Sequence, residues 1–167
     1  MIERPEQDAP RALDKAAELF SKGIVQSLLV QREGRLAGPI PVHEPEGDIS
    51  SWFIGVQVGD RLAGFIHLDR RLELLRYSTF QRHPGSLEGS PSARSWIDPQ
   101  YVLERAMTQI PRGMKAAEPY MTYDQDLSRL TWAVPWTDMT GLVHTVFVAG
   151  EFVYTRSAKL GSEGTTD

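Results

Sequence analysis

Four histidines are the residues best suited to acid–base chemistry near neutral pH, because the ordinary pKa of imidazole lies close to neutrality. They are His43, His67, His83 and His144. None lies in a recognised catalytic or metal-binding motif, so a structural or surface role is the simpler interpretation of each. An enzyme would need folding to bring a histidine next to a carboxylate. The candidate pairs are His67 or His144 with Asp69, Asp124 or Asp126.

Carboxylates gather in two short segments of the sequence. Residues 43–48 are His-Glu-Pro-Glu-Gly-Asp, and residues 123–126 are Tyr-Asp-Gln-Asp. Oxygen and imidazole ligands in the first segment could hold a metal ion. The spacing matches no calcium loop or zinc-binding helix, however, and a solvated hairpin loop has the same composition. Aspartate is also common in turns, where it bonds to nearby backbone. We therefore expect no metal and no cofactor.

Aromatic side chains offer a second kind of chemistry, namely apolar contact. Trp132 and Trp136 are four residues apart, which puts both on one face of a straight strand, whereas the adjacent Trp52 and Phe53 must point to opposite faces. If such rings are exposed, or lie together in a groove, they would contact an apolar ligand or a partner protein. The predicted contact residues are Trp52, Trp132, Trp136, Tyr120 and Tyr123. The alternative is that these rings fill a core between helix and sheet.

A basic stretch within an acidic protein is the last candidate. It comprises Arg70, Arg71, Arg76, Arg82 and His83. Its alternation with leucines is typical of a solvated edge strand, which arginine protects from unwanted pairing. Docking of an acidic partner is the functional alternative. The formal net charge of −4 would repel phosphates on average, so we expect no nucleic-acid partner.

The strongest enzyme signatures are missing from the sequence. The glycines lie singly at turns or in strands, so there is no Gly-rich phosphate loop. Neither a Gly-x-Ser-x-Gly elbow nor a Ser-x-x-Lys motif is present to activate a serine. The sequence has no cysteine, which excludes disulfides, thiolate metal sites and a cysteine nucleophile. These absences favour a non-catalytic protein.

The bulk composition is that of a soluble globular protein, with 41% hydrophobic and 24% charged residues. No apolar run approaches the roughly 18 residues that a membrane span requires. The first residues lack the basic start and apolar core of a secretory signal. We therefore expect a cytoplasmic protein with no membrane partner.

The first half of the chain is predicted to be one helix followed by antiparallel strands. A helix from about residue 10 to 22 is favoured because Pro10 suits a first helical turn and Gly23 supplies a left-handed stop. The strands expected after it are residues 24–31, 37–43, 52–58, 62–68 and 72–77. The hairpin that turns at Gly59-Asp60 is the clearest of these signals.

The second half repeats this order after a connection rich in Gly, Ser and Pro. Asp98-Pro99 begins a helix, since Asp can accept hydrogen bonds from the free N–H groups of the first turn while Pro occupies its first position. The strands expected after it are residues 120–123, 130–135, 142–148 and 152–154. The organisation predicted is a first unit at 1–80, a linker at 81–97, a second unit at 98–157 and a disordered tail at 158–167.

The two halves also match in sequence at a nearly constant offset. Residues 12–16 align with 102–106 at an offset of 90, and residues 58–60 align with 149–151 at an offset of 91. The predicted fold class is therefore α+β, with two tandem units that each combine a helix and an antiparallel meander. The alternative is one α+β domain whose halves share common hairpin features.

This arrangement resembles the PepSY-like and, more loosely, the cystatin-like α+β units, in which a curved sheet wraps one helix. Residues 12–23 with the strands up to residue 68 carry the resemblance, as do residues 99–113 with the strands up to residue 154. PepSY-like domains are binding or inhibitory modules, usually of exported proteins. This sequence departs from them in lacking both a signal sequence and their Asp-x-x-Thr-Gly turn, so no functional residue is carried over.

The sequence thus predicts a non-catalytic module that binds a protein or an apolar small molecule. The alternative is a small enzyme with a His/carboxylate site formed between the two units. Self-association into a homodimer is a further hypothesis, because open sheet edges can pair with a second copy.

Overall fold

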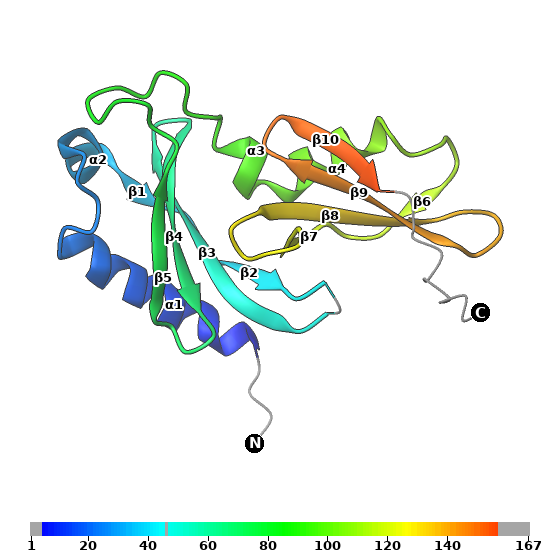
Figure 1. Cartoon of the computed structure of the whole chain (residues 1–167), viewed down its shortest axis with the longest axis horizontal. Helices are drawn as coiled ribbons and strands as arrows, with labels where there is room; N and C mark the ends of the chain where they lie inside the picture. Colours follow the sequence, from blue (N-terminus) through cyan, green and yellow to red (C-terminus); the bar gives the residue numbers. More distant parts are fainter. Residues whose placement is uncertain (1–4, 46, 157–167) are drawn as a thin grey trace, which may run out of the picture.

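Within residues 5–45 and 47–156, which the structure describes, this computed structural model is an α+β fold with four helices and one ten-stranded sheet (Figure 1). The helices are α1 (Pro5–Ser21), α2 (Leu28–Glu33), α3 (Arg94–Ile97) and α4 (Pro99–Met107). The strands are β1 (Arg35–Leu36), β2 (Ile40–His43), β3 (Ile49–Val58), β4 (Arg61–Asp69), β5 (Leu74–Thr79), β6 (Lys115–Ala116), β7 (Tyr120–Tyr123), β8 (Leu130–Thr137), β9 (Val143–Ala149) and β10 (Phe152–Arg156).

The sheet runs through both halves of the chain in the order β10-β9-β8-β7-β2-β3-β4-β5, with β1 added to β3 and β6 to β8. Its strand pairs are antiparallel except for β2 and β7, which pair in parallel where Val42 meets Met121. This parallel pair joins the strands of the first half to those of the second. In Figure 1, β3 to β5 run vertically and β8 to β10 horizontally, so the sheet twists strongly across the join.

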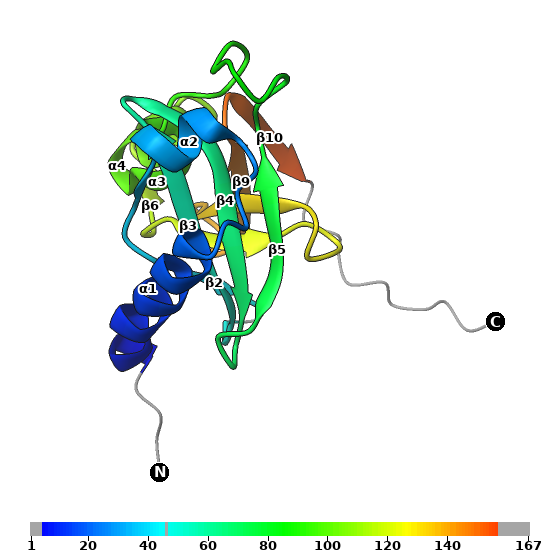
Figure 2. The ribbon, with the colours of Figure 1, turned by 90° about the vertical axis from the view of Figure 1, so that its left-hand side faces the viewer.

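The helices cover opposite faces of this sheet. Trp52 on β3 packs in a cluster with Ala16 of α1, whereas its neighbour Phe53 packs in a cluster with Ala106 of α4. Adjacent residues of a strand point to opposite faces, so α1 and α4 lie on different sides of the sheet. Figure 2 shows α1 and α2 alongside β3 and β4; α1 contacts both strands, and α2 contacts β3.

The core on the α4 side draws on both halves of the chain. Phe53 and Phe65 from the first half belong to the same buried cluster as Met121, Leu130 and Trp132 from the second. The buried residues of the core on the α1 side come from the first half, and Leu87 of the connection packs against them. The two halves therefore share apolar packing as well as a sheet.

Most of the expected elements are confirmed. The hairpin predicted at 52–58 and 62–68 is β3–β4, and the edge strand predicted at 72–77 is β5. The helix expected at Asp98-Pro99 is α4, where the Asp98 carboxylate accepts a hydrogen bond from the Gln100 N–H at 3.0 Å.

The strand predicted at residues 24–31 is wrong, because residues 28–33 form α2. Ser27 caps this helix by accepting the Val30 N–H at 3.3 Å. Short runs of Ile, Val and Leu suit a strand and a buried helix equally well, so the serine cap decides between them.

Two further expectations concern the ends of the units. The segment predicted as a linker, residues 81–97, contains the short helix α3 and the fully buried Ser95. The predicted disordered tail at 158–167 lies outside the described residues. In the part of the chain that the structure describes, no helix is long and apolar enough to cross a membrane.

Candidate functional site

Two of the five predicted contact residues are buried, and they lie in different parts of the core. Trp52 is 3% exposed in the cluster beneath α1, and Trp132 is 3% exposed in the cluster beneath α4. The Trp132 indole N–H donates to the Trp96 carbonyl at 2.7 Å. These two rings stabilise the fold and leave little surface for a ligand.

The other three predicted residues are partly buried, and each has a local partner. The Trp136 ring stacks on His144 with 4.4 Å between centroids. Tyr120 meets the edge of His43 at 5.8 Å, and the Tyr123 hydroxyl donates to a carboxylate oxygen of Glu44. The structure does not bring the five residues together into one surface.

His144 does have a carboxylate partner, although it is not one of those predicted. Its Nε2 lies 2.8 Å from Asp138 Oδ2, and the other carboxylate oxygen of Asp138 accepts the hydroxyl and backbone N–H of Thr140. The hydrogen bonds from His144 and then from Thr140 hold the pKa of the Asp138 carboxyl well below its usual range. The pair orients an imidazole as a general base would require. Both residues belong to the β8–β9 hairpin and so do not form a site between the two units.

His67 faces a hydroxyl group in place of a carboxylate. Its Nε2 lies 2.7 Å from Ser51 Oγ on the neighbouring strand. The two residues are 1% and 0% exposed, respectively, so no substrate can reach this histidine–serine pair in the folded chain. Burial, and after it the nearby Arg76 guanidinium, lower the His67 pKa to about 4. The imidazole is therefore neutral at pH 7.

Metal binding finds no support in the described residues. Within residues 5–45 and 47–156, no three His, Asp or Glu side chains are grouped closely enough to hold an ion. In the segment considered for metal binding, His43 Nδ1 instead bonds to the Gly47 carbonyl oxygen at 3.0 Å.

A cleft of about 520 Å³ lies where the two halves meet, and we call it the junction cleft. Its lining comprises Arg61, Phe80, residues 89–91, Trp96 and residues 149–152. The first half, the connection and the second half thus each supply part of the wall. This volume lies within the range of roughly 300–1,000 Å³ that is typical of ligand sites.

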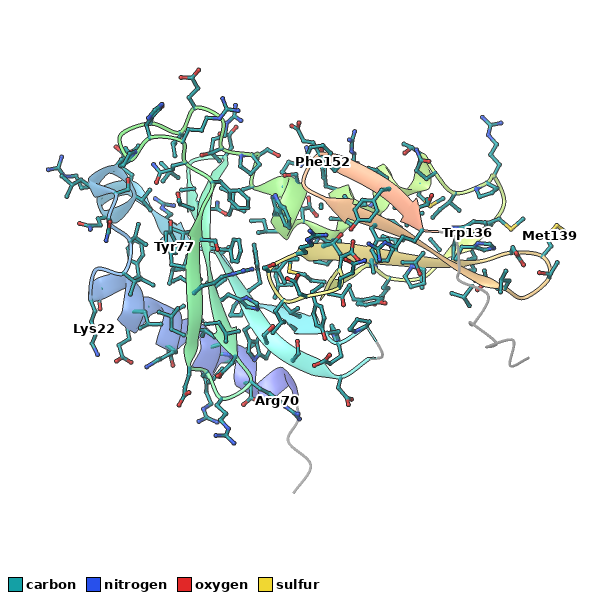
Figure 3. All side chains as sticks on the ribbon, in the orientation of Figure 1. Lys22, Arg70, Tyr77, Trp136, Met139 and Phe152 are labelled. Carbon is teal, nitrogen blue, oxygen red and sulfur yellow. The ribbon has the colours of Figure 1, made fainter. Side chains whose placement is uncertain are left out.

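Aromatic rings give the junction cleft its chemical character. Phe80 and Trp96 lie 5.7 Å apart between centroids, and Trp96 also stacks at 6.2 Å on the buried Phe53. Phe152, at the start of β10, is 79% exposed, and Figure 3 shows it beside α3. Two rings are thus fixed against the core, while a third presents its apolar surface to solvent.

Hydrogen bonds to backbone carbonyls hold one wall of the junction cleft in place. Arg61 donates from its guanidinium to the Ser90 carbonyl at 2.9 Å, and the Leu62 N–H donates to the Pro91 carbonyl at 2.9 Å. On the opposite side, Gly150 has φ +61°, and a Cβ at this position would lie 3.0 Å from Trp96 Nε1. The site is therefore largely preformed, which lowers the entropic cost of binding.

A second cleft has a volume of about 480 Å³. It lies between residues 24–27, β5 and residues 81–84. Two of its polar side chains bond within the chain: Ser27 Oγ donates to the Pro84 carbonyl at 2.5 Å, and Gln81 Nε2 donates to the same carbonyl at 3.2 Å. These bonds join the connection to the first half, which is a structural role. The buried Tyr77 hydroxyl, which also lines this cleft, has no hydrogen-bond partner among the described residues.

The sequence does not predict Trp96 and Phe152 as contact residues. Two signals could have indicated them. Trp96 lies two residues before the helix start at Asp98-Pro99, in a segment with little else to bury, and Phe152 follows a Gly-Glu hairpin turn directly. Their proximity, however, depends on the path of the connection.

Comparisons with protein-family models, curated proteins and solved structures gave no match for this chain.

Proposed function

We propose that this chain is a non-catalytic binding module whose junction cleft takes up an aromatic or other flat apolar group of a protein or small molecule. The observation that carries the proposal is the preformed cleft between Phe80, Trp96 and the 79%-exposed Phe152. A large exposed ring beside a cleft is an apolar surface without a partner, and such surfaces mark binding sites.

The size of the hydrophobic effect supports a ligand of this kind. Removing apolar surface from water stabilises a complex by about 25 cal/mol per Å². A ring inserted between Trp96 and Phe152 would also gain from stacking, because aromatic pairs contribute about 0.5–1.5 kcal/mol beyond their burial. The enzyme alternative rests on His144 and Asp138, a pair that lies outside the lining of this cleft.

The test is titration of the ¹⁵N-labelled full chain with indole as a probe. The four tryptophans give four indole N–H signals, and Trp96→Phe assigns the one in the cleft. We expect saturable shifts of the Trp96 indole and Gly150 amide signals and no shift at the buried Trp52. Phe152→Ser should weaken binding about fivefold, the equivalent of about 1 kcal/mol of lost contact.

Leu28→Ser is the matched control, since Leu28 is 64% exposed on α2, far from the cleft in sequence and absent from its lining. It should leave indole binding unchanged. Equal shifts of all four tryptophans, or equal weakening by both substitutions, would show that indole binds without a site and would refute the proposal.

We also infer that the two halves arose by tandem duplication and that the junction cleft formed where the copies meet. Two observations support this: the offset of 90 between the helix sequences, and a strand order that reads alike outward from β2 and from β7. A binding role is also what the PepSY-like resemblance implies. Pairing of the edge strands β5 and β10 with a second copy remains the route by which a homodimer would form.

A further inference from the structure

A cleft of about 460 Å³ between α1 and the β4–β5 turn gathers three arginines. Arg11 comes from α1, and Arg70 and Arg71 come from the turn; Asp8 and Leu72 complete the lining. Figure 3 shows Arg70 at the end of the hairpin, beside the first part of α1. This arginine cleft shares no lining residue with the junction cleft.

The charges in the arginine cleft are not balanced. Three guanidinium groups face one carboxylate, and the ion pair that Asp8 forms is a long one, 3.6 Å from Oδ1 to the Arg11 guanidinium. Among residues whose side chains the structure describes, Arg70 and Arg71 form no ion pair. The lining therefore carries a surplus of about two positive charges in a chain whose net charge is −4.

The nearby Asp69 carboxylate is not part of the lining of the arginine cleft and instead holds the turn together. Asp69 Oδ1 accepts the backbone N–H groups of Arg71 at 2.8 Å and Glu73 at 2.9 Å. The same turn holds Leu72 at φ +65°, a left-handed conformation that costs a residue with a side chain roughly 1–2 kcal/mol. Strain of this kind persists where surrounding contacts impose it, and it clusters at functional sites. The turn thus fixes the backbone at Arg70 and Arg71, whose exposed side chains line the cleft beside Arg11 of α1.

We propose that the arginine cleft is a binding site for a doubly charged phosphate group, carried by a small molecule as a diphosphate or a phosphate monoester. The planar guanidinium presents paired N–H donors that match two phosphate oxygens, and such charge-assisted bonds are stronger than neutral ones. A phosphate dianion would offset the surplus charge of the lining. The apolar Leu72 would pack against the uncharged part of the small molecule.

Isothermal titration of the full chain with sodium pyrophosphate and, separately, with O-phosphoserine tests the proposal and distinguishes the two sources of phosphate. We expect at least one of the two probes to bind to the chain at a single site. Raising the salt concentration from 20 to 150 mM should weaken binding, since exposed charges are screened over about 10 Å at 0.1 M. Arg70→Gln with Arg71→Gln should weaken binding at least tenfold. Arg71→Lys keeps the charge without the paired donors and should weaken it about threefold.

Arg112→Gln with Lys115→Gln is the control, because it removes two exposed charges from another part of the chain. It should change the affinity less than twofold. Far-UV circular dichroism confirms that each variant is folded. No heat from either probe, or an equal loss of affinity in the control and in the Arg70/Arg71 variant, would overturn the proposal. The indole titration involves other residues, so either proposal can fail while the other holds.

Discussion

His67 shows how a single buried residue can make the stability of this chain depend on pH. It lies on β4 at 1% exposure, bonded to Ser51 and paired across the sheet with Arg76. A proton on its imidazole would be a buried charge next to a guanidinium, and for this reason its pKa falls to about 4 from 6.5. In the unfolded chain the imidazole regains its ordinary pKa. Between pH 6.5 and 4 the unfolded state therefore takes up a proton that the folded state does not.

We expect His67 to lower the free energy of unfolding as the solution becomes more acidic. The effect is absent above pH 6.5, grows as the pH falls toward 4 and reaches about 2 kcal/mol at pH 5. His67→Gln keeps a hydrogen-bonding group near Ser51 but removes the titration. Urea unfolding at pH 7 and pH 5 should show a loss of stability about 2 kcal/mol smaller in this variant than in the unsubstituted chain.

His83→Gln is the control for this measurement, since His83 is exposed in the segment after β5. It should follow the unsubstituted chain at both pH values. If His67→Gln loses as much stability on acidification as the unsubstituted chain, His67 is protonated in the folded state and the pKa argument is wrong.

At the scale of elements, the β3–β4 and β9–β10 hairpins turn in similar ways but have different surroundings. Gly59 has φ +59° in the first turn and Gly150 has φ +61° in the second. A Cβ on Gly59 would meet nothing within 4 Å, whereas a Cβ on Gly150 would lie 3.0 Å from Trp96 Nε1. The two glycines thus separate the cost of backbone strain from the cost of disturbing the junction cleft.

We expect Gly59→Ala to destabilise the chain by about 1 kcal/mol, because only the left-handed backbone conformation is strained. Gly150→Ala should cost about 1 kcal/mol more, since Trp96 must also move. Thermal unfolding measures both costs. Gly150→Ala should also weaken indole binding, and Gly59→Ala should not. Equal effects of the two substitutions on stability and on binding would contradict the described contact between Gly150 and Trp96.

The elements differ in how far the sequence predicts them, and the reason is local. The β3–β4 hairpin and α4 carry their own signals, the turn at Gly59-Asp60 and the cap at Asp98, so they were predicted correctly. Helix α2 was predicted as a strand because its signal is a single serine cap within an apolar run. Residue type and spacing within one strand predict Trp136 and Tyr123 as contact residues, whereas the lining of the junction cleft comes from segments about 90 residues apart. No local sequence pattern predicts that these distant segments lie side by side.

At the scale of the whole molecule, the two halves share one core. Phe53 and Phe65 of the first half pack with Leu130 and Trp132 of the second. Polar contacts also cross the join, where the Arg76 guanidinium donates to the Leu127 carbonyl at 3.1 Å. A half on its own would expose this apolar surface to water. Each side chain that becomes exposed in this way would lower the free energy of unfolding by roughly 1.5–3 kcal/mol. That loss is large beside the 5–15 kcal/mol that stabilises a typical domain.

We therefore expect the full chain to unfold in one cooperative transition, although its sequence suggests two units. Calorimetric and van't Hoff enthalpies should agree, and circular dichroism and tryptophan fluorescence should report the same midpoint in urea. Residues 1–80 and 98–157, expressed separately, should each lack a cooperative transition because the shared cluster is incomplete.

Two resolved transitions in the full chain, or a cooperative transition in either fragment alone, would mean that the halves are independent domains. The junction cleft would then be a contact between domains instead of a preformed site, and its affinity for indole should change when the connection at 81–93 is lengthened.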